Sequence, residues 1–457
     1  MKVIICGAGR VGKGIAARLA TEGNVVTVVD VSPELIRQIT TELDVHGLVG
    51  HGAYPDMLAQ AGAESAEMII AVTYSDEVNM MACQIAHSLF DVPTKVARVR
   101  AQNYLASEWN DLFSRENMPI DVVISPEVEI GKSILRRLNT PGAFDVVPFA
   151  NGRVQLLGIR ITEDTPIINT PLGQITDLFP GLHSVVVGIK RDQDVFAPTS
   201  DDMLNPGDEA YVITLSEHAP RLLEIIGNTS QKARQIVIIG GGNIGAYVAS
   251  ELEKLAGVRV RVIERDKARA EKASEVLRRT VILNGDAMDA DIQDEAGVAN
   301  AELVLCLTDD DKTNLLSAVL AKKTGARRTV VLVNEASMQG VRQELGIDLV
   351  VDPRATTVSS ILRHVRRGRI LDVFSIDEGC AEVMEGEVLE TSPLAGKSLG
   401  SVDIGEGVII GAVIHDGRVV FPTDDLVVKP GDSLVLLAER NALKAVEQLF
   451  RVSMDYF

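Results

Sequence analysis

A glycine-rich loop occurs twice in this chain, each time directly after a short apolar segment. The first loop, GAGRVG at residues 7–12, follows the apolar residues 3–5, and the second, GGGNIG at residues 240–245, follows residues 236–239. An apolar strand, a tight glycine turn and a helix in that order are typical of the first unit of a parallel βαβ sheet. The repeat therefore predicts two such sheets in a chain of 457 residues, which is too long for one hydrophobic core.

The similarity between the two halves continues well beyond the loops. Residues 25–30, 71–79 and 120–138 are matched by residues 258–264, 306–314 and 347–365. The offset changes from 233 residues (7 to 240) to 235 (71 to 306) and 227 (120 to 347). A pattern repeated in order with small shifts predicts an internal duplication with short insertions and deletions.

Short apolar strands alternate with helical stretches inside each copy. In the first copy, Val11, Ile15 and Leu19 share one stripe of a helix that closes at Gly23, and a second helix begins at Ser32-Pro33. Strands are predicted near residues 2–6, 25–30, 47–50, 68–73, 94–100 and 120–125. Nearly continuous apolar strands that alternate with helices predict a doubly wound parallel sheet.

Two other segments differ from these in composition and pattern. Residues 143–227 and 369–453 are rich in Val, Ile, Gly and Asp, and each contains a Pro-Gly-Asp triplet, at 206–208 and 430–432, which predicts a tight turn before a strand. The predicted fold class is α/β, with two Rossmann-like domains that are each followed by a small α+β domain. The predicted domains cover residues 1–124, 143–227, 232–351 and 369–453.

The glycine loops have the spacing of a dinucleotide-binding turn. In the first copy Gly7 permits the turn, Gly9 lets the backbone approach a pyrophosphate, and Gly12 allows close packing of helix and strand. Asp30 and Glu264, 18 and 19 residues after the last loop glycine, end the next strand. An acid there accepts hydrogen bonds from a ribose diol and repels a 2′-phosphate, so the pattern favours NAD or an adenine nucleotide over NADP.

The two copies differ at positions near the ligand crevice. The fifth strand of the first copy carries Arg98 and Arg100, whereas the corresponding residues 329–334 contain no arginine, and Arg10 becomes Asn243. We therefore expect unequal nucleotide affinities, or two different nucleotides. Thr73 and Thr308 end the fourth strands, where a hydroxyl either faces the nucleotide or has a structural role. The acids and amides that follow, at positions 76, 79, 311 and 314, are expected to cap the next helix.

Catalytic residues are scarce beside both loops. A dehydrogenase needs a proton relay or Lewis acid near its cofactor, and none of the seven histidines pairs with another at ligand spacing. Only His51 is placed near the crevice, and its counterpart in the second copy is Gly285 or Asn284. The sequence thus favours binding and sensing over catalysis, with no catalytic or metal residue. A soluble NAD-dependent oxidoreductase with two cofactor domains stays the alternative.

The charge balance limits the class of partner. The chain has 45 basic and 64 acidic residues, a net charge of −19, which argues against a nucleic-acid partner and against loose adsorption to anionic lipid. Its densest basic cluster is expected to be a solvated helix face: Arg363, Arg366, Arg367 and Arg369. No apolar run reaches the roughly 18–20 residues of a membrane-spanning helix. The first residues enter a strand at once, and Cys6 and Cys306 lie in apolar strands as core residues, so we expect a cytoplasmic protein.

The combined pattern resembles the TrkA family, the peripheral nucleotide-binding subunits of bacterial Trk potassium uptake systems. The resemblance rests on GAGRVG, GHGAYPDML at 50–58, AVTYSDEVNMMACQIA at 71–86, GGGNIG and TDDDKTN at 308–314, all in order. It covers essentially the whole chain and includes the tandem RCK (regulator of potassium conductance, or KTN) arrangement.

The resemblance implies a cytoplasmic gating ring, a homo-tetramer on the inner face of the plasma membrane beneath a potassium channel subunit of the TrkH or TrkG type. It implies NAD(H) and ATP or ADP as ligands, with no nucleic acid and no enzymatic activity. The first site implied by the resemblance comprises Gly7, Ala8, Gly9, Arg10, Val11, Asp30, Thr73, Tyr74 and Arg98. The second comprises Gly240, Gly241, Gly242, Asn243, Ile244 and Glu264. A nucleotide regulator of a potassium efflux antiporter is a further alternative, although such regulators usually carry one copy of this unit.

Overall fold

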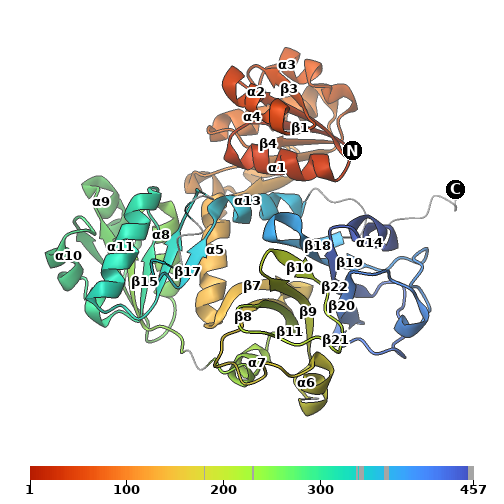
Figure 1. Ribbon diagram of the computed structural model, residues 1–457. Helices are drawn as coiled ribbons and strands as arrows, with labels where there is room; N and C mark the ends of the chain where they lie inside the picture. The colour runs from red at the N-terminus through yellow and green to blue at the C-terminus, as the bar shows by residue number, and fades with distance from the viewer. Residues whose placement is uncertain (180, 229–230, 336–337, 339–343, 365–369, 451–457) are drawn as a thin grey trace. The chain divides into compact units, whose positions relative to one another are not determined.

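Four sheets make up the computed structural model, which describes residues 1–457 except 180, 229–230, 336–337, 339–343, 365–369 and 451–457 (Figure 1). The chain divides into two compact units: residues 1–134 with 233–365, and residues 135–232 with 366–457. The first unit holds two parallel sheets and the second holds two antiparallel sheets. The predicted α/β class with two Rossmann-like domains is confirmed.

The first parallel sheet has the strand order β3-β2-β1-β4-β5-β6, which is the order of a dinucleotide-binding sheet. Its strands are β1 (Lys2–Cys6), β2 (Val25–Asp30), β3 (His46–Val49), β4 (Met68–Ala71), β5 (Thr94–Arg98) and β6 (Val122–Ile124). Its helices are α1 (Arg10–Thr21), α2 (Pro33–Glu42), α3 (Pro55–Gln60) and α4 (Asp76–Phe90), followed by α5 (Pro126–Asn139). Apolar side chains cover both faces, so the near-continuous apolar strands are explained.

The second parallel sheet repeats this order as β14-β13-β12-β15-β16-β17. Its strands are β12 (Gln235–Ile239), β13 (Arg259–Glu264), β14 (Val281–Asn284), β15 (Leu303–Cys306), β16 (Thr329–Leu332) and β17 (Leu349–Val351). Its helices are α8 (Asn243–Leu252), α9 (Lys267–Val276), α10 (Ala290–Glu295) and α11 (Asp311–Thr324), followed by α13 (Pro353–Leu362). The identical strand order supports the predicted duplication.

Local signals in the sequence explain where these elements begin and end. Ile15 and Leu19 of α1 are buried, and the Ser32 hydroxyl caps α2 by accepting the Leu35 N–H at 3.3 Å, both as predicted. Strand β4 ends at Ala71 rather than near residue 73, because the Thr73 N–H is taken by the Asn79 side chain at 2.8 Å. Cys6 and Cys306 are fully buried, as expected.

The two halves of the first unit exchange a helix. Helix α13, from the second half of the sequence, packs on α1, and its Ile361 and Leu362 belong to the core of the first sheet. Helix α5, from the first half, approaches α8 so closely that a Cβ at Gly131 would lie 2.3 Å from the Tyr247 ring. Each crossover helix therefore packs against the domain of the other half.

The basic cluster predicted on this segment is only partly described. Arg363, just after α13, donates hydrogen bonds to Glu129 at 3.1 Å and to Ser360 at 3.2 Å. The expectation of a solvated face is therefore wrong for Arg363, because its guanidinium group is paired. Arg366, Arg367 and Arg369 lie outside the described residues.

The second unit contains two five-stranded antiparallel sheets with equivalent orders, β10-β9-β11-β8-β7 and β18-β19-β22-β20-β21. The first comprises β7 (Ala143–Phe149), β8 (Val154–Arg160), β9 (Ser184–Arg191), β10 (Asp194–Phe196) and β11 (Glu209–Leu215), with α6 (Leu172–Leu178) and α7 (Ala219–Ile225). The second comprises β18 (Ile370–Ile376), β19 (Ala381–Glu387), β20 (Val408–His415), β21 (Arg418–Val420) and β22 (Ser433–Glu439), with α14 (Leu443–Leu449).

These two sheets share one hydrophobic core. Phe149, Leu156 and Ile213 of the first sheet lie in the same cluster as Val383 and Leu437 of the second. The predicted Pro-Gly-Asp turns are confirmed, with Gly207 at φ +96° and Gly431 at φ +88°. In each turn the Asp side chain accepts the N–H of the residue three positions earlier at 2.8 Å.

Candidate functional site

The first glycine loop lies between β1 and α1, and its three glycines have three different surroundings. Gly7 has φ +112°, and a Cβ there would lie 3.0 Å from the backbone of residues 72 and 73. A Cβ at Gly12 would lie only 1.8 Å from the Gly7 carbonyl oxygen, so close packing of loop and helix requires glycine. Gly9 has no heavy atom within 4 Å of its Cβ position, and it precedes α1 without a side-chain cap. This helix start therefore has room for a ligand that accepts hydrogen bonds from the first N–H groups of α1.

The second loop repeats this arrangement between β12 and α8. Gly240 has φ +103°, and a Cβ at Gly245 would lie 1.9 Å from the Gly240 carbonyl oxygen. Gly242 has open space around its Cβ position and precedes α8 without a side-chain cap. Both loops thus have the open space that a pyrophosphate needs, because no heavy atom of the described residues lies within 4 Å of the Cβ position of Gly9 or Gly242.

An acid at the end of the second strand is bound to each loop. Asp30 accepts the Ala8 N–H at 2.7 Å and the Ser32 N–H at 2.9 Å. In the second copy Glu264 accepts the Gly241 N–H at 2.7 Å and the Asp266 N–H at 2.8 Å. Each carboxylate therefore lies at the loop, where an acid that binds a ribose diol is needed.

Asn79 and Asn314 fix the end of the fourth strand, a role that differs from the helix cap predicted for them. Asn79 accepts hydrogen bonds from the N–H and hydroxyl of Thr73 at 2.8 and 2.6 Å, and donates to the carbonyls of Thr73 and Arg98. Asn314 does the same for Thr308 and Leu332. Both threonine hydroxyls are thus already held by structural hydrogen bonds.

The expected helix caps lie one residue away from the acids. Ser75 and Asp310 cap α4 and α11, whereas Asp76 accepts the N–H groups of residues 100 and 101 at 2.9 and 2.8 Å. Asp311 likewise accepts the N–H groups of residues 334 and 335. The capping prediction for Asp76 and Asp311 is therefore wrong, because these acids instead hold the backbone that follows the fifth strand.

Cationic side chains gather beside the first loop. Arg98 is half-buried at the end of β5, and its Nε has no hydrogen-bond partner among the described residues. Burial and the neighbouring Arg100 lower the pKa of Arg98. Arg100 donates to Glu127 at 2.9 Å and lies 5.4 Å from the centroid of the exposed Tyr74 ring. Arg10, at the first position of α1, is exposed and lies 4.0 Å from Glu335.

The second copy lacks these cations. The bond from Asn314 to the Leu332 carbonyl matches the bond from Asn79 to the Arg98 carbonyl, so Leu332 stands at the place of Arg98. Asn243 takes the place of Arg10 at the start of α8. The predicted difference in cationic residues is therefore present in the structure. The pairing of Arg100 with Glu127 was missed, because the two residues lie 27 positions apart and no local sequence pattern links them.

The remaining predicted residues lie close to the loops. Ala8 is buried and Val11 packs against the core of the first sheet, while Ile244 is half-buried in the first turn of α8. Tyr74 is 85% exposed, directly after Thr73.

His51 has a local structural role beside the first site. Its ring stacks on Tyr54 with 4.4 Å between centroids, and its Nδ1 accepts the Ala53 N–H at 3.3 Å. The predicted counterpart, Gly285 or Asn284, is wrong. The Gly285 N–H bonds to the Glu264 carbonyl as the Gly50 N–H bonds to that of Asp30, so the register places Asp286 opposite His51.

Cys6 is the thiol nearest to the first loop. Burial, with the charge of Asp30, raises its pKa to about 12, so it stays protonated. Among the residues that the structure describes, no group of three or more His, Cys, Asp or Glu side chains is arranged to hold a metal ion. Within the same residues, no helix combines the length and the apolar character needed to cross a bilayer.

Solved structures with the same fold define the class. The crystal structure of the GsuK RCK domain is 19% identical and has a TM-score of 0.60, covering 98% of this chain and 94% of that one. The chain thus has the fold of the GsuK RCK domain.

Sequence comparisons then identify the family. The TrkA-N domain model matches residues 3–126 and 236–353, and the TrkA-C domain model matches residues 156–227 and 383–451. The Trk system potassium uptake protein TrkA of Azorhizobium caulinodans is 52% identical over 458 residues, which is 100% of both chains. That of Halomonas elongata is 38% identical over 461 residues, also 100% of both. The chain belongs to the TrkA family, and the resemblance seen in the sequence is confirmed.

Proposed function

We propose that this chain is the nucleotide-binding regulatory subunit of a bacterial Trk-type potassium uptake system. The main support for this proposal is the pair of glycine loops. In each loop one glycine, Gly9 or Gly242, has open space at its Cβ position, and one acid, Asp30 or Glu264, accepts a backbone hydrogen bond from the loop. Relatives named Trk system potassium uptake protein TrkA match the full length. Structures titled GsuK channel bound to NAD (18% identity, TM-score 0.60, 98% of this chain and 78% of that one) and GsuK bound to ADP share its fold.

The proposed ligands are NAD(H) and ATP or ADP. In the first site the backbone of residues 7–11 would hold the phosphates, Asp30 the ribose, and Arg10 and Arg98 would add positive charge, with Thr73 and Tyr74 at the crevice edge. In the second site residues 240–244 and Glu264 would take these roles without an arginine. A group rich in phosphate oxygens fits the free N–H groups at Gly9 and Gly242. The two sites are therefore expected to differ in affinity.

The proposed assembly is a homo-tetrameric ring at the cytoplasmic face of the plasma membrane, bound to a channel subunit of the TrkH or TrkG type. The proposed domains are residues 1–124, 143–227, 232–351 and 369–453. A nucleotide that binds two ring conformations unequally shifts their populations by its differential affinity. A tenfold preference at one site supplies about 1.4 kcal/mol, so several sites on one ring can sum to a usable gating energy.

We further propose that the chain is not an enzyme. Near the first loop the His51 ring is stacked on Tyr54, and the Cys6 thiol is buried and protonated. Neither group is placed as a free acid, base or nucleophile.

The test is potassium or rubidium uptake in cells that lack this chain. These cells then receive the wild-type chain, Asp30→Ala or Glu264→Ala at matched expression levels. Thermal unfolding of each purified variant checks that it is folded. Uptake should fall without the chain, recover with the wild type, and recover poorly with Asp30→Ala. A weaker defect in Glu264→Ala would support the unequal sites.

Uptake that is indifferent to the chain would refute the transport role. Substrate-dependent reduction of NAD by the purified chain would instead favour the oxidoreductase. Normal uptake with Asp30→Ala, together with lost NAD binding, would separate transport from nucleotide control.

A further inference from the structure

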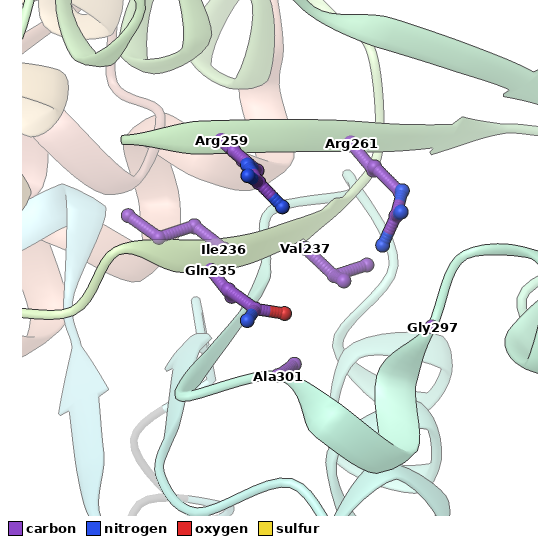
Figure 2. Close-up of a pocket in the computed structure, with 7 residues that line it drawn as sticks. All are labelled: Gln235, Ile236, Val237, Arg259, Arg261, Gly297 and Ala301. Carbon is purple, nitrogen blue, oxygen red and sulfur yellow. The ribbon is translucent and has the colours of Figure 1, made fainter. Parts of the chain in front are cut away.

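A polar pocket lies at the amino edge of the second parallel sheet, the edge opposite the glycine loop. One hollow of about 30 Å³ is lined by the starts of β12 and β13, including Gln235, Arg259 and Arg261, and by Gly297 and Ala301 (Figure 2). A second hollow of about 370 Å³ is lined by Gln235, residues 299–302 and Arg327. Gln235 and Ala301 line both, so the two hollows are neighbours, and the polar pocket comprises both.

Two arginines of β13 point into this pocket from the same side of the strand. Arg259 and Arg261 are two residues apart, so they share a face of the sheet, and Figure 2 shows both side chains leaving β13 towards the space above Gln235 and Val237. Arg261 is held in place by a hydrogen bond of 3.1 Å to the Ala296 carbonyl. A Cβ at Gly297, which has φ +67°, would lie 2.6 Å from Arg261 Nη1. A glycine is therefore needed there for this guanidinium position.

Three polar side chains of the pocket have no partner among the described residues. Within the described residues the side chains of Arg259, Arg327 and Gln235 make no hydrogen bond or ion pair. Glu302 is the one acid among the described residues that line the pocket, and it accepts the Arg234 N–H at 2.6 Å. Arg259 and Arg261 line the smaller hollow, and Arg327 and Glu302 line the larger one. Arginines therefore outnumber acids in the described lining, on a chain of net charge −19.

The first copy shows that the fold does not require these arginines. Lys2 pairs with Val25 as Gln235 pairs with Arg259, and Ile4 pairs with Thr27 as Val237 pairs with Arg261. The counterparts of Arg259 and Arg261 are therefore Val25 and Thr27. Because residues 95 and 329 hold the same register against Asp121 and Asp348, Pro93 is the counterpart of Arg327. The cationic cluster thus belongs to the second copy alone.

We propose that this pocket binds a small anion with two or more charges, of the diphosphate type, at a site separate from both glycine loops. Guanidinium groups bind phosphate oxygens through paired, charge-assisted hydrogen bonds, and the Gln235 amide adds a donor. The larger hollow, lined by Gln235 and Arg327, has the size of a small-molecule site, and Arg259 and Arg261 line the smaller hollow next to it. Among the described residues no aromatic side chain lines the pocket, so this lining lacks the stacking surface that single-stranded nucleic acid needs.

The experiment titrates inorganic pyrophosphate into the full chain by calorimetry, with NAD and ADP present at saturation so that the glycine-loop sites are filled. Arg259→Val, which copies the first half, should weaken binding about tenfold, the loss of roughly one charge-assisted hydrogen bond. Arg259→Lys should retain part of the affinity. Lys272→Val removes one exposed positive charge from α9, so it is the matched control and should leave binding unchanged.

Equal pyrophosphate affinity in wild type and Arg259→Val, or no binding by the wild type at millimolar pyrophosphate, overturns the proposal. Because the Arg259 side chain is exposed, its removal should leave thermal unfolding unchanged, so a loss of binding reports on the site. A second arm measures sedimentation with phosphatidylglycerol vesicles. If the chain sediments with the vesicles and Arg259→Val abolishes this, the ligand is a lipid headgroup and the proposal of a free anion is wrong. If the chain does not sediment with the vesicles, the free anion is supported.

Discussion

Asp30 accepts the backbone N–H of Ala8 at 2.7 Å, which ties the end of β2 to the glycine loop that follows β1. Glu264 makes the equivalent bond to Gly241 with a longer side chain, also at 2.7 Å. The acid therefore has two roles in each copy. Its carboxylate orients the loop by accepting a backbone N–H of the loop. The same carboxylate presents oxygens beside the open space at Gly9 or Gly242.

Asp30→Ala should weaken NAD binding about tenfold or more, because a hydrogen bond to a charged group contributes roughly 1.5–3 kcal/mol. Calorimetry of the purified chain checks this, and urea unfolding measures the accompanying loss of stability. Asp30→Asn keeps an acceptor oxygen for the Ala8 N–H and should retain more stability than Asp30→Ala. Unchanged NAD affinity in both variants would show that the carboxylate does not bind the ligand.

Gly9→Ala and Gly12→Ala should separate binding from folding. The Cβ position of Gly9 faces open space and its φ is −65°, so Gly9→Ala should cost only the preference for glycine over alanine at a helix N-cap, about 0.5–1 kcal/mol. The same methyl group blocks the approach of a phosphate, so NAD binding should be lost. Gly12→Ala places a Cβ 1.8 Å from the Gly7 oxygen and should destabilise the protein by about 1–3 kcal/mol.

Thermal unfolding and NAD titration of both glycine variants provide the measurement. The second copy offers a matched pair, Gly242→Ala and Gly245→Ala, with the same contrast of open space and a 1.9 Å approach. If Gly9→Ala proved as destabilising as Gly12→Ala, the assignment of separate roles to these glycines would fail.

Ile361→Ala should destabilise the first parallel-sheet domain although it lies in the second half of the sequence. Ile361 is fully buried in the core of the first sheet, and such truncations cost about 2–5 kcal/mol. Hydrogen exchange should show the loss of protection in β1 and β2. Leu316→Ala, on the exposed side of α11, is the control and should have little effect. Loss of protection confined to the second sheet would contradict the helix exchange.

Glu385→Gln should make stability less dependent on pH. Burial raises the pKa of Glu385, Asp372 raises it further, and the hydrogen bond from the Ala150 N–H (2.8 Å) and the charge of Arg153 lower it. Because the folded state favours the protonated acid, the wild type loses stability as the pH rises from the ordinary glutamate pKa through the raised value. Glutamine keeps an acceptor for Ala150 and carries no charge. Urea unfolding should therefore show a stabilisation by Glu385→Gln at pH 7 that vanishes near pH 4.

Much of the first unit could be predicted because its signals are local. The alternation of apolar strands and helices, the Ser32 cap and the loop glycines all act within about thirty residues of sequence. The acids Asp30 and Glu264 were found for the same reason, since they end the strand after the loop. The missing arginine of the second copy was also visible in the aligned sequence.

The features that the sequence did not reveal depend on distant contacts. No local pattern shows that Ile361 packs under the first sheet, or that Val383 shares a core with Phe149. The counterpart of His51 was misplaced because the offset between the copies changes by one or two residues across a loop, which only the backbone hydrogen bonds fix. The role of Asn79 depends on the approach of β5, which lies 19 residues away at Arg98.

The exchange of α13 has a consequence for the order in which the protein is made. The core of the first sheet uses residues 3–124 together with residues 358–362, so it is incomplete when the ribosome has synthesised the first third of the chain. Since chains grow at about 5–20 residues per second, at least ten seconds separate the first domain from its last helix. During that time the α1 face that α13 covers is an exposed apolar surface, and a chaperone or a nascent neighbour on the same messenger RNA can occupy it first.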